Sequence, residues 1–340
     1  MFKLEYRKVL FFRFLLAFLL MTATANAQSR QSSLLIEAET GRVLQSENAT
    51  EKRYPASLTK MMTLYMVFDA LEKKEIQIDQ LLPVSVNAAK QPKSRMGLKA
   101  GSTISVENAI FAMISRSAND AAVVVAESLG GSEAQFADKM TRVAHELGMK
   151  DTRFKNASGL HNKDQVTSAR DMAILSMALI QHFPKYYKLF SVKGFRYGRR
   201  YYGNHNLVAR FYKGGDGLKT GYVDASGYHV VGSAKRNGKR LIGVVMGRNS
   251  VRERDRHIFK LLDFGFAALK KEAPTLATMN EEPLFSSTPV PPKTEREYRQ
   301  ARIKARQITE ELDAVASLSD SLTMQDKDKI TKKAIVEWRY

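Results

Sequence analysis

Ser57 and Lys60 are the residues of this chain whose types and spacing most directly suggest covalent chemistry. They stand three positions apart at the start of a helix-like segment, residues 57–71, and side chains with this spacing are neighbours on a helix, about 5–6 Å between Cβ atoms. A serine hydroxyl becomes a useful nucleophile when a base takes its proton, and a lysine can serve where burial or another cation lowers its pKa. Free N–H groups at a helix start can also stabilise an oxyanion. The pair therefore indicates acyl transfer. The same spacing of serine and lysine, however, often belongs to a helix-capping serine followed by a surface lysine.

Two short motifs follow in the order that a serine–lysine acyl-transfer enzyme requires. Ser117 and Asn119 lie at a helix junction and offer a second hydroxyl and an amide. Lys219, Thr220 and Gly221 lie on a strand-like run between glycines. A lysine cation there can hold a substrate carboxylate and lower the pKa of the lysine in the first motif, while the glycine lets a peptide backbone approach. Each motif singly also fits a helix cap or a surface lysine, but the ordered set is far more specific.

The sequence around these motifs also follows the pattern of one enzyme family. Four stretches show the similarity: residues 54–63, 117–122, 154–160 and 216–222. A late strand-like run at 244–247 and Arg254 add to the match. Together they resemble the boxes of the serine D-alanyl-D-alanine carboxypeptidases, the low-molecular-weight penicillin-binding proteins, over about residues 28–270. The resemblance implies a β-lactamase/transpeptidase-like fold with a helical subdomain, and an enzyme that acts on peptidoglycan and reacts covalently with penicillin.

The resemblance implies catalytic roles at the matching positions. Ser57 is expected to attack the carbonyl of the penultimate D-Ala, with Lys60 as general base. Ser117 and Lys219 are expected to relay the proton to the leaving amine. Backbone N–H groups of Ser57 and Tyr222 are expected to form the oxyanion hole. Related enzymes often carry histidine where this chain has Tyr222, so the backbone role carries over and a side-chain role in deacylation stays open.

The other matching positions are expected to bind substrate. Asn119 would hold the substrate amide, and Gly221 would let the peptide backbone approach the strand. Lys219, Thr220 and Arg254 would hold the terminal carboxylate. Neither a metal nor a cofactor is expected. None of the six histidines falls at a position that the motifs require, which disfavours a Ser-His-Asp triad.

The elements that must position these residues follow from periodicity and turn signals. Helical patterns recur at 57–71, 106–114, 119–129, 132–147, 168–180 and 252–269. Residues 33–44 predict a strand pair, and 227–234 and 240–246 predict two more strands joined by Asn237-Gly238, a pair that accepts the positive φ of a type I′ hairpin. With strands at both ends and helices between, we expect an α/β domain of the α+β kind, in which one antiparallel sheet is assembled from both ends and covered by helices.

Four segments make up the predicted organisation. Residues 1–27 join a basic start, a short apolar run and an Ala-Asn-Ala ending, which is typical of a cleaved signal peptide. Residues 28–274 predict the catalytic domain, 275–294 a Pro-rich linker and 295–340 a charged tail, helical or disordered. The absence of cysteine is compatible with export. We expect a protein of the periplasm or of the outer face of the cytoplasmic membrane, with contact to a membrane surface left open.

The charge of the chain is strongly basic, with 54 Lys and Arg against 35 Asp and Glu and a net charge of +19. Residues 185–213 concentrate this charge, because they hold eight cations and no acid, interleaved with tyrosines. Such a strip suits nucleic acid, but export argues against a nucleic-acid partner and favours anionic wall polymer or lipid headgroups. The structural alternative is a solvated loop whose tyrosines pack beneath it.

Three other functions share parts of this pattern. A β-lactamase of class A needs a deacylating glutamate, whereas the acids between residues 152 and 171 are aspartates. A D,D-endopeptidase uses the same motifs and differs in pocket width. A catalytically silent wall-binding protein would work through the basic strip and the tail. The favoured function is a serine DD-carboxypeptidase that removes the terminal D-Ala from peptidoglycan stem peptides through an acyl-enzyme on Ser57, with β-lactam antibiotics as covalent inhibitors.

Overall fold

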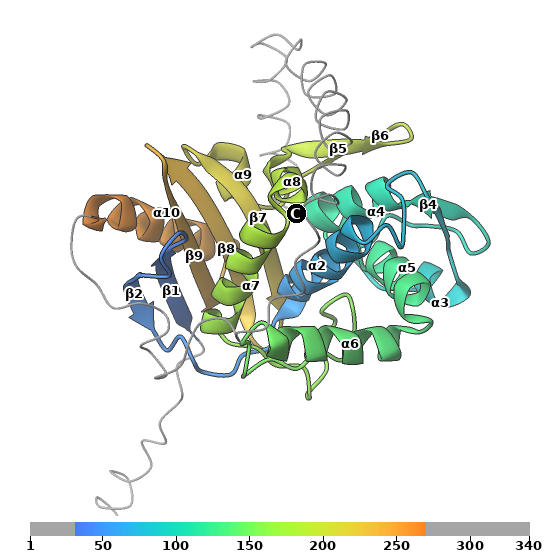
Figure 1. The fold of residues 1–340 in the computed structure, drawn as a ribbon, viewed down its shortest axis with the longest axis horizontal. Coiled ribbons are helices and arrows are strands. Elements are labelled where there is room, and N and C mark those ends of the chain that lie inside the picture. Colours follow the sequence, from blue (N-terminus) through green and yellow to red (C-terminus); the bar gives the residue numbers. More distant parts are fainter. Residues whose placement is uncertain (1–30, 270–340) are drawn as a thin grey trace, which may run out of the picture.

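A five-stranded antiparallel sheet forms the centre of the fold (Figure 1). The structure is a computed structural model that describes residues 31–269. In spatial order β2-β1-β9-β8-β7, the strands are β2 (Val43–Glu47), β1 (Ser32–Glu37), β9 (Lys239–Arg248), β8 (Gly227–Arg236) and β7 (Gly215–Val223). Strand β1, from one end of the domain, therefore pairs with β9 from the other. This arrangement confirms the predicted sheet assembled from both ends.

The turn between β8 and β9 is the one that the sequence predicts. Asn237 and Gly238 both adopt positive φ, 50° and 79°, as a type I′ turn requires. The turn sets the register of the two strands, from Arg236 opposite Lys239 inward to Val231 opposite Val244. These central strands are buried on both faces over most of their length, which explains their nearly continuous apolar sequences.

Helices cover both faces of the sheet. α10 (Val251–Ala268) packs on β8 and β9 on one face, and α7 (Ala169–His182) packs on β1 and β9 on the other (Figure 1). Because side chains alternate along a strand, neighbouring residues of β1 enter different cores: Leu34 lies in the large core with the α7 side chains, and Leu35 in the smaller core beneath α10.

A helical region lies beyond the β7 edge of the sheet (Figure 1). It comprises α2 (Thr59–Glu72), α3 (Val86–Ala89), α4 (Val106–Phe111), the π-helical turn η2 (Ala112–Arg116), α5 (Asn119–Gly130) and α6 (Glu133–Glu146), with the short strand pair of β3 (Leu81–Pro83) and β4 (Thr103–Ser105). α2 is buried on almost every side, so its sequence is apolar around the whole helix. This region is the predicted helical subdomain.

Local structure differs from the sequence prediction in several places, including the unpredicted α3, β3 and β4. The helix expected from residue 57 begins with a 3-10 turn, η1 (Ala56–Leu58), and becomes α-helical at Thr59. The helix expected at 106–114 ends at Phe111 and continues as η2. The basic strip, for which no elements were predicted, folds into α8 (Pro184–Tyr187), η3 (Lys188–Ser191), β5 (Gly194–Tyr197), β6 (Arg200–Gly203) and α9 (Leu207–Phe211).

Several predictions concern segments outside the described residues. The signal peptide at 1–27, the linker at 275–294 and the tail at 295–340 lie there, as do both predicted boundaries of the catalytic domain, at 28 and 274. Across residues 31–269, none of the helices combines the length and the apolar composition that a bilayer crossing needs.

Candidate active site

Ser57 and Lys60 meet where the helical region joins the sheet. Ser57 lies in η1 and Lys60 in the first turn of α2, and the Nζ of Lys60 is 3.2 Å from the Oγ of Ser57. The residue before the serine, Ala56, has a positive φ of 49°, which is unfavourable for a residue with a side chain. The backbone is thus held in an uncommon conformation next to the candidate nucleophile. Ser57 itself is partly exposed, whereas Lys60 is fully buried.

The surroundings of Lys60 favour its neutral form. Burial lowers the pKa of Lys60 well below its usual value, and the nearby cation of Lys219 lowers the pKa further. The Nζ of Lys60 also lies 2.7 Å from the Oδ1 of Asn119 and within hydrogen-bond distance of the Ser158 carbonyl oxygen. Both oxygens can only accept. A neutral amine that donates its two N–H bonds to them keeps its lone pair for the hydroxyl of Ser57, so this geometry suits proton transfer from serine to lysine.

The loop that supplies the Ser158 carbonyl is held by its own polar side chains. Asn156 accepts from the N–H of Gly159 at 2.7 Å and donates to the Leu160 carbonyl at 2.9 Å. The Oε1 of Gln165 accepts from the backbone N–H groups of residues 155 and 156. The role of the Ser158 carbonyl was not predicted. The match at residues 154–160 pointed to this loop, but a backbone oxygen leaves no residue-type signal.

Gly159 allows this loop to lie directly against η1. Its φ is +84°, and a Cβ atom at this position would lie 1.8 Å from the Ala56 carbonyl oxygen and 2.9 Å from the backbone nitrogen of Ser57. A side chain therefore has no room here. Thr63 on α2 holds the same loop from the other side by donating to the Ala157 carbonyl at 2.7 Å. The loop, the serine turn and the first turns of α2 form one packed unit.

Ser117 and Asn119 lie at the junction of η2 and α5: Ser117 follows the last residue of η2, and Asn119 is the first residue of α5. Ser117 has left-handed φ and ψ of 59° and 38°, an uncommon conformation that non-glycine residues adopt at a cost of about 1–3 kcal/mol. Its Oγ is buried and has no hydrogen-bond partner within residues 31–269. Asn119 accepts from Lys60 through Oδ1 and donates through Nδ2 to the Pro92 carbonyl at 3.0 Å. The predicted second motif thus contacts the first.

Asp120, next to Asn119, orders the loop in front of this junction. Its carboxylate accepts from the backbone N–H groups of Met96, Gly97 and Leu98 at 3.0, 2.8 and 3.2 Å. The side chain is fully buried, so these bonds satisfy a charge that would otherwise be costly to desolvate. Asp120 was part of the matched stretch 117–122 but was not predicted as a site residue, because a carboxylate that holds a loop has the same sequence appearance as a surface acid.

The third motif lies on β7, an edge strand of the sheet that pairs with β8 on one side. Lys219 is buried and donates to the Thr220 carbonyl at 2.9 Å. Burial lowers its pKa to about 7, and the cation of Arg254 adds to the effect. A Cβ at Gly221 would lie 3.1 Å from the backbone nitrogen of Ser57, so the missing side chain keeps β7 close to the serine turn. The three predicted motifs therefore converge on Ser57.

Arg254 and Tyr222, two further predicted site residues, differ in the burial of their side chains. Arg254 lies in the first turn of α10, is 5% exposed and pairs with Asp255 at 2.8 Å. Tyr222 follows Gly221 on β7, but its side chain is 48% exposed, packs against the tilted ring of Tyr228 with ring centroids 4.2 Å apart and donates to Asp224. The phenol is thus directed into solvent, and only the main chain of Tyr222 accompanies the strand past the serine.

Comparison with known proteins identifies the family. Residues 20–250 match the sequence profile of the family described as D-alanyl-D-alanine carboxypeptidase. The chain belongs to this family. D-alanyl-D-alanine carboxypeptidase DacF of Bacillus subtilis is 36% identical over 250 residues, which cover 71% of this chain and 63% of that protein. The chain therefore matches less than two thirds of the length of this relative.

Solved structures of related proteins have the same fold. Penicillin binding protein 5 from Haemophilus influenzae superposes with a TM-score of 0.67 and 34% identity, over 69% of this chain and 70% of that chain. Penicillin-binding protein D2 from Listeria monocytogenes, in its ampicillin-bound form, superposes with a TM-score of 0.61 and 32% identity, over 69% of this chain and 96% of that chain. The chain therefore has the β-lactamase/transpeptidase-like fold that the resemblance of its motifs implied.

The buried histidine near the site of this carboxypeptidase family member has a structural role. His229 on β8 accepts from the Gly247 N–H through Nδ1 at 2.9 Å, and its Nε2 lies 3.1 Å from the Tyr54 carbonyl oxygen and 2.9 Å from Ser226. The proton therefore resides on Nε2. Burial lowers the pKa of His229 to about 4, so it is neutral at pH 7. It joins the sheet to the segment before Ser57.

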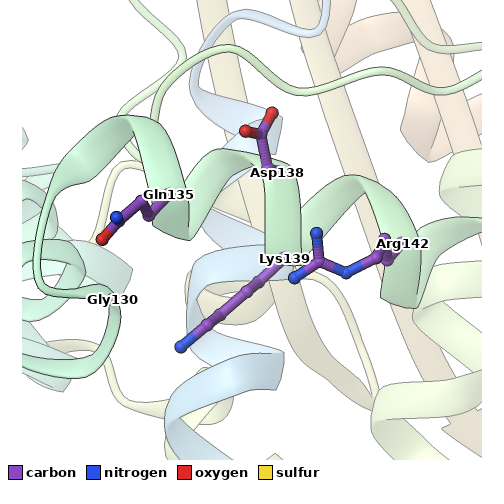
Figure 2. A pocket seen from close by; sticks show the side chains of 5 residues that line it. All are labelled: Gly130, Gln135, Asp138, Lys139 and Arg142. Carbon is purple, nitrogen blue, oxygen red and sulfur yellow. The ribbon is translucent and has the colours of Figure 1, made fainter.

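A surface hollow of about 350 Å³ lies away from these residues, between the end of α5 and α6 (Figure 2). It is lined by Gly130, Gln135, Asp138, Lys139 and Arg142. None of the predicted site residues lines it, and its acidic and basic side chains balance in part. Within residues 31–269 no group of His, Asp and Glu side chains has the arrangement of a metal site.

Proposed function

We propose that this protein is a serine DD-carboxypeptidase that removes the terminal D-Ala from peptidoglycan pentapeptide stems through an acyl-enzyme on Ser57. The observation that carries the proposal is the environment of Lys60, whose buried amine lies 3.2 Å from the serine hydroxyl and has two pure acceptors for its N–H bonds. Membership of the D-alanyl-D-alanine carboxypeptidase family supports the substrate class.

Acylation begins with proton transfer from Ser57 to the neutral amine of Lys60. The serine oxygen bonds to the carbonyl carbon of the penultimate D-Ala, and the carbonyl oxygen becomes an oxyanion. The backbone N–H groups of Ser57 and Tyr222 are the proposed donors to that oxyanion, because β7 packs against η1 at Gly221, where even an added Cβ would lie 3.1 Å from the Ser57 nitrogen. Such donors stabilise the transition state more than the substrate, so they accelerate the reaction.

Collapse of this intermediate requires a proton on the departing nitrogen. Ser117 is suited to deliver it, because its buried Oγ has no partner within residues 31–269 and lies in the motif that contacts Lys60. The proton comes from Lys60 or Lys219, the C–N bond breaks, and D-Ala leaves with its amine protonated. Water then attacks the ester, its proton returns to Ser57, and the shortened stem is released as a carboxylic acid.

Recognition of the terminal carboxylate is assigned to Lys219, Thr220 and Arg254. Lys219 is buried at the site, and Arg254 lies close enough to lower its pKa, so an anion between them relieves the repulsion of the two cations. Asn119 is assigned to the substrate amide. β-Lactams carry a carboxylate beside a reactive amide, and the ampicillin-bound relative supports the proposal that they acylate Ser57 in this chain too.

Localisation is also a proposal. A basic, apolar and small-residue start at 1–27 supports export to the periplasm or the outer face of the cytoplasmic membrane, where peptidoglycan is found.

A D,D-endopeptidase would use the same site on cross-linked stems. The carboxypeptidase is favoured because the matched relative bears that activity in its name.

Time-resolved intact mass spectrometry with benzylpenicillin tests the proposal, with Ser57→Ala as the control and D-Ala release from a soluble pentapeptide measured in parallel. We expect a long-lived adduct on Ser57 together with D-Ala release. An adduct that disappears as penicillin is turned over, without D-Ala release, would indicate a β-lactamase instead. Folded protein that gives neither adduct nor D-Ala would refute an enzymatic role at this site.

A further inference from the structure

The basic strip of the sequence forms a hairpin at the margin of the proposed active site. β5 and β6 pair antiparallel, with Arg196 opposite Tyr201 and Tyr197 opposite Arg200. Because side chains of paired residues share a face, Arg196 lies on one face of the ribbon and Arg200 on the other, with Arg199 in the turn. Figure 1 shows the hairpin extending from the molecule on the side opposite α6.

Hydrogen bonds at the base of the hairpin tie it to the site. Asn204 donates from its backbone N–H to the Lys193 carbonyl at 2.8 Å, which closes the hairpin. The next residue, His205, donates its N–H to the carbonyl of Ser115 in η2, two positions before Ser117. Asn206 donates to the Val231 carbonyl on β8 at 3.1 Å. The hairpin is therefore joined to both the Ser117 turn and the sheet.

Cations cover this hairpin without acidic partners. Lys193, Arg196, Arg199 and Arg200 are exposed, and Arg210 on α9 is half-buried. The sequence contains no acid from residue 185 to 215. In the part of the chain that the structure describes, none of these five cations forms a salt bridge with an Asp or Glu side chain. A concentrated positive field is expected here.

Two aromatic rings lie among these cations. Tyr201 is 53% exposed and Phe211 is 55% exposed. Arg210 lies over the ring of Phe211, 4.6 Å from its centroid, and Tyr201 is paired with Arg196 on one face of the hairpin. We call the five cations together with these two rings the hairpin surface.

We propose that the hairpin surface is a second binding site for peptidoglycan, which holds the polymer outside the catalytic site while one stem is processed. Peptidoglycan combines carboxylate-bearing stem peptides with sugar rings, so it offers anions to the cations and apolar sugar faces to Tyr201 and Phe211. A polymer strand that enters the site near Ser117 must continue across a neighbouring surface, and the hairpin lies there. The identity of the polymer rests on the proposed function.

The arrangement of the cations favours a flexible polymer over a membrane. A bilayer presents one plane of headgroups, which contacts one face of a ribbon. The hairpin carries Arg196 and Arg200 on its two faces, so a flat surface leaves one of them unused, whereas a flexible polyanion can contact both. Binding through dispersed exposed charges is also expected to weaken as salt is added.

Binding of the full chain to purified insoluble peptidoglycan tests the proposal, in a Ser57→Ala background so that no substrate is consumed. The hairpin variant carries Arg196→Gln, Arg199→Gln and Arg200→Gln. A matched control removes the same charge on the opposite side of the molecule through substitutions at and just after α6: Lys139→Gln, Arg142→Gln and Lys150→Gln. Benzylpenicillin labelling of both sets with Ser57 restored checks that each variant is folded.

We expect the hairpin variant to bind peptidoglycan roughly tenfold more weakly than the Ser57→Ala parent, and the control to stay within about twofold of it. Equal binding by all three proteins, equal losses in both variants, or no binding by the parent would each overturn the proposal. Tighter binding to phosphatidylglycerol vesicles than to peptidoglycan, lost only in the hairpin variant, would reassign the surface to a membrane. Pentapeptide cleavage by the chain with Ser57 tests the proposed function separately, since its failure leaves the binding result unaffected.

Discussion

Gly159→Ala is the substitution for which the structure makes the sharpest prediction. The new Cβ would lie 1.8 Å from the Ala56 carbonyl oxygen, and real contacts of this kind begin at about 3.0 Å. The loop and the serine turn must therefore separate by about 1.2 Å. That movement draws the Ser158 carbonyl away from Lys60 or shifts Ser57 itself. A displacement of about 1 Å at reacting groups can cost on the order of 10²-fold in rate, so we expect acylation by benzylpenicillin to slow by about that factor.

Gly101→Ala is the matched control, because Gly101 has a φ of +80° and no atom within 4 Å of a built Cβ. Both variants incur the left-handed penalty of about 1–2 kcal/mol, which corresponds to a fall in Tm of roughly 2–8 °C for a domain of this size. Acylation kinetics and thermal unfolding are measured on both. Acylation of the Gly159→Ala protein within about threefold of the parent would refute the reasoning that this contact positions the serine and the lysine.

Three further predictions concern ionisable groups of the site. Lys219 is cationic below its pKa of about 7, so carboxylate binding, and with it kcat/KM for a pentapeptide, should fall above that pH. Arg254→Gln removes a cause of the lowered pKa and should move this alkaline fall in kcat/KM to higher pH. An unchanged pH–rate profile would contradict the assignment. Lys60→Met should slow penicillin acylation by about 10²–10⁴-fold, measured by mass spectrometry, and near-normal labelling would exclude Lys60 as the base. Asp120→Asn removes the charge that accepts from three N–H groups at 96–98 and should destabilise the protein by about 1.5–3 kcal/mol, with faster hydrogen exchange at those amides as the direct readout and unchanged exchange as the contrary result.

Much of the fold was predictable because its signals are local. The Asn237-Gly238 turn, the 3.6-residue periodicity of the helices and the apolar runs of β8 and β9 each arise from a few neighbouring residues. The 3-10 start at η1 and the π turn at η2 were missed, since tertiary packing around Ser57 and Ser117 imposes them. The β5–β6 hairpin was missed for a related reason: its strands are short, and its inward ring, Phe195, is stabilised by stacking on the distant Phe111.

The sequence by itself determined which chemical groups the proposed site contains, because a hydroxyl, an amine and a second cation are properties of residue types, and their order along the chain is specific. Only the tertiary structure decided which lysine has its pKa lowered most strongly toward the neutral form, and why. The pKa of Lys60 depends on burial and on Lys219, which is far away in sequence, and its hydrogen-bond acceptors include a backbone carbonyl that any residue could supply. The desolvation of a side chain, the electrostatic field at it and the backbone groups within its reach all depend on the surrounding atoms. Those atoms are brought together only by the fold.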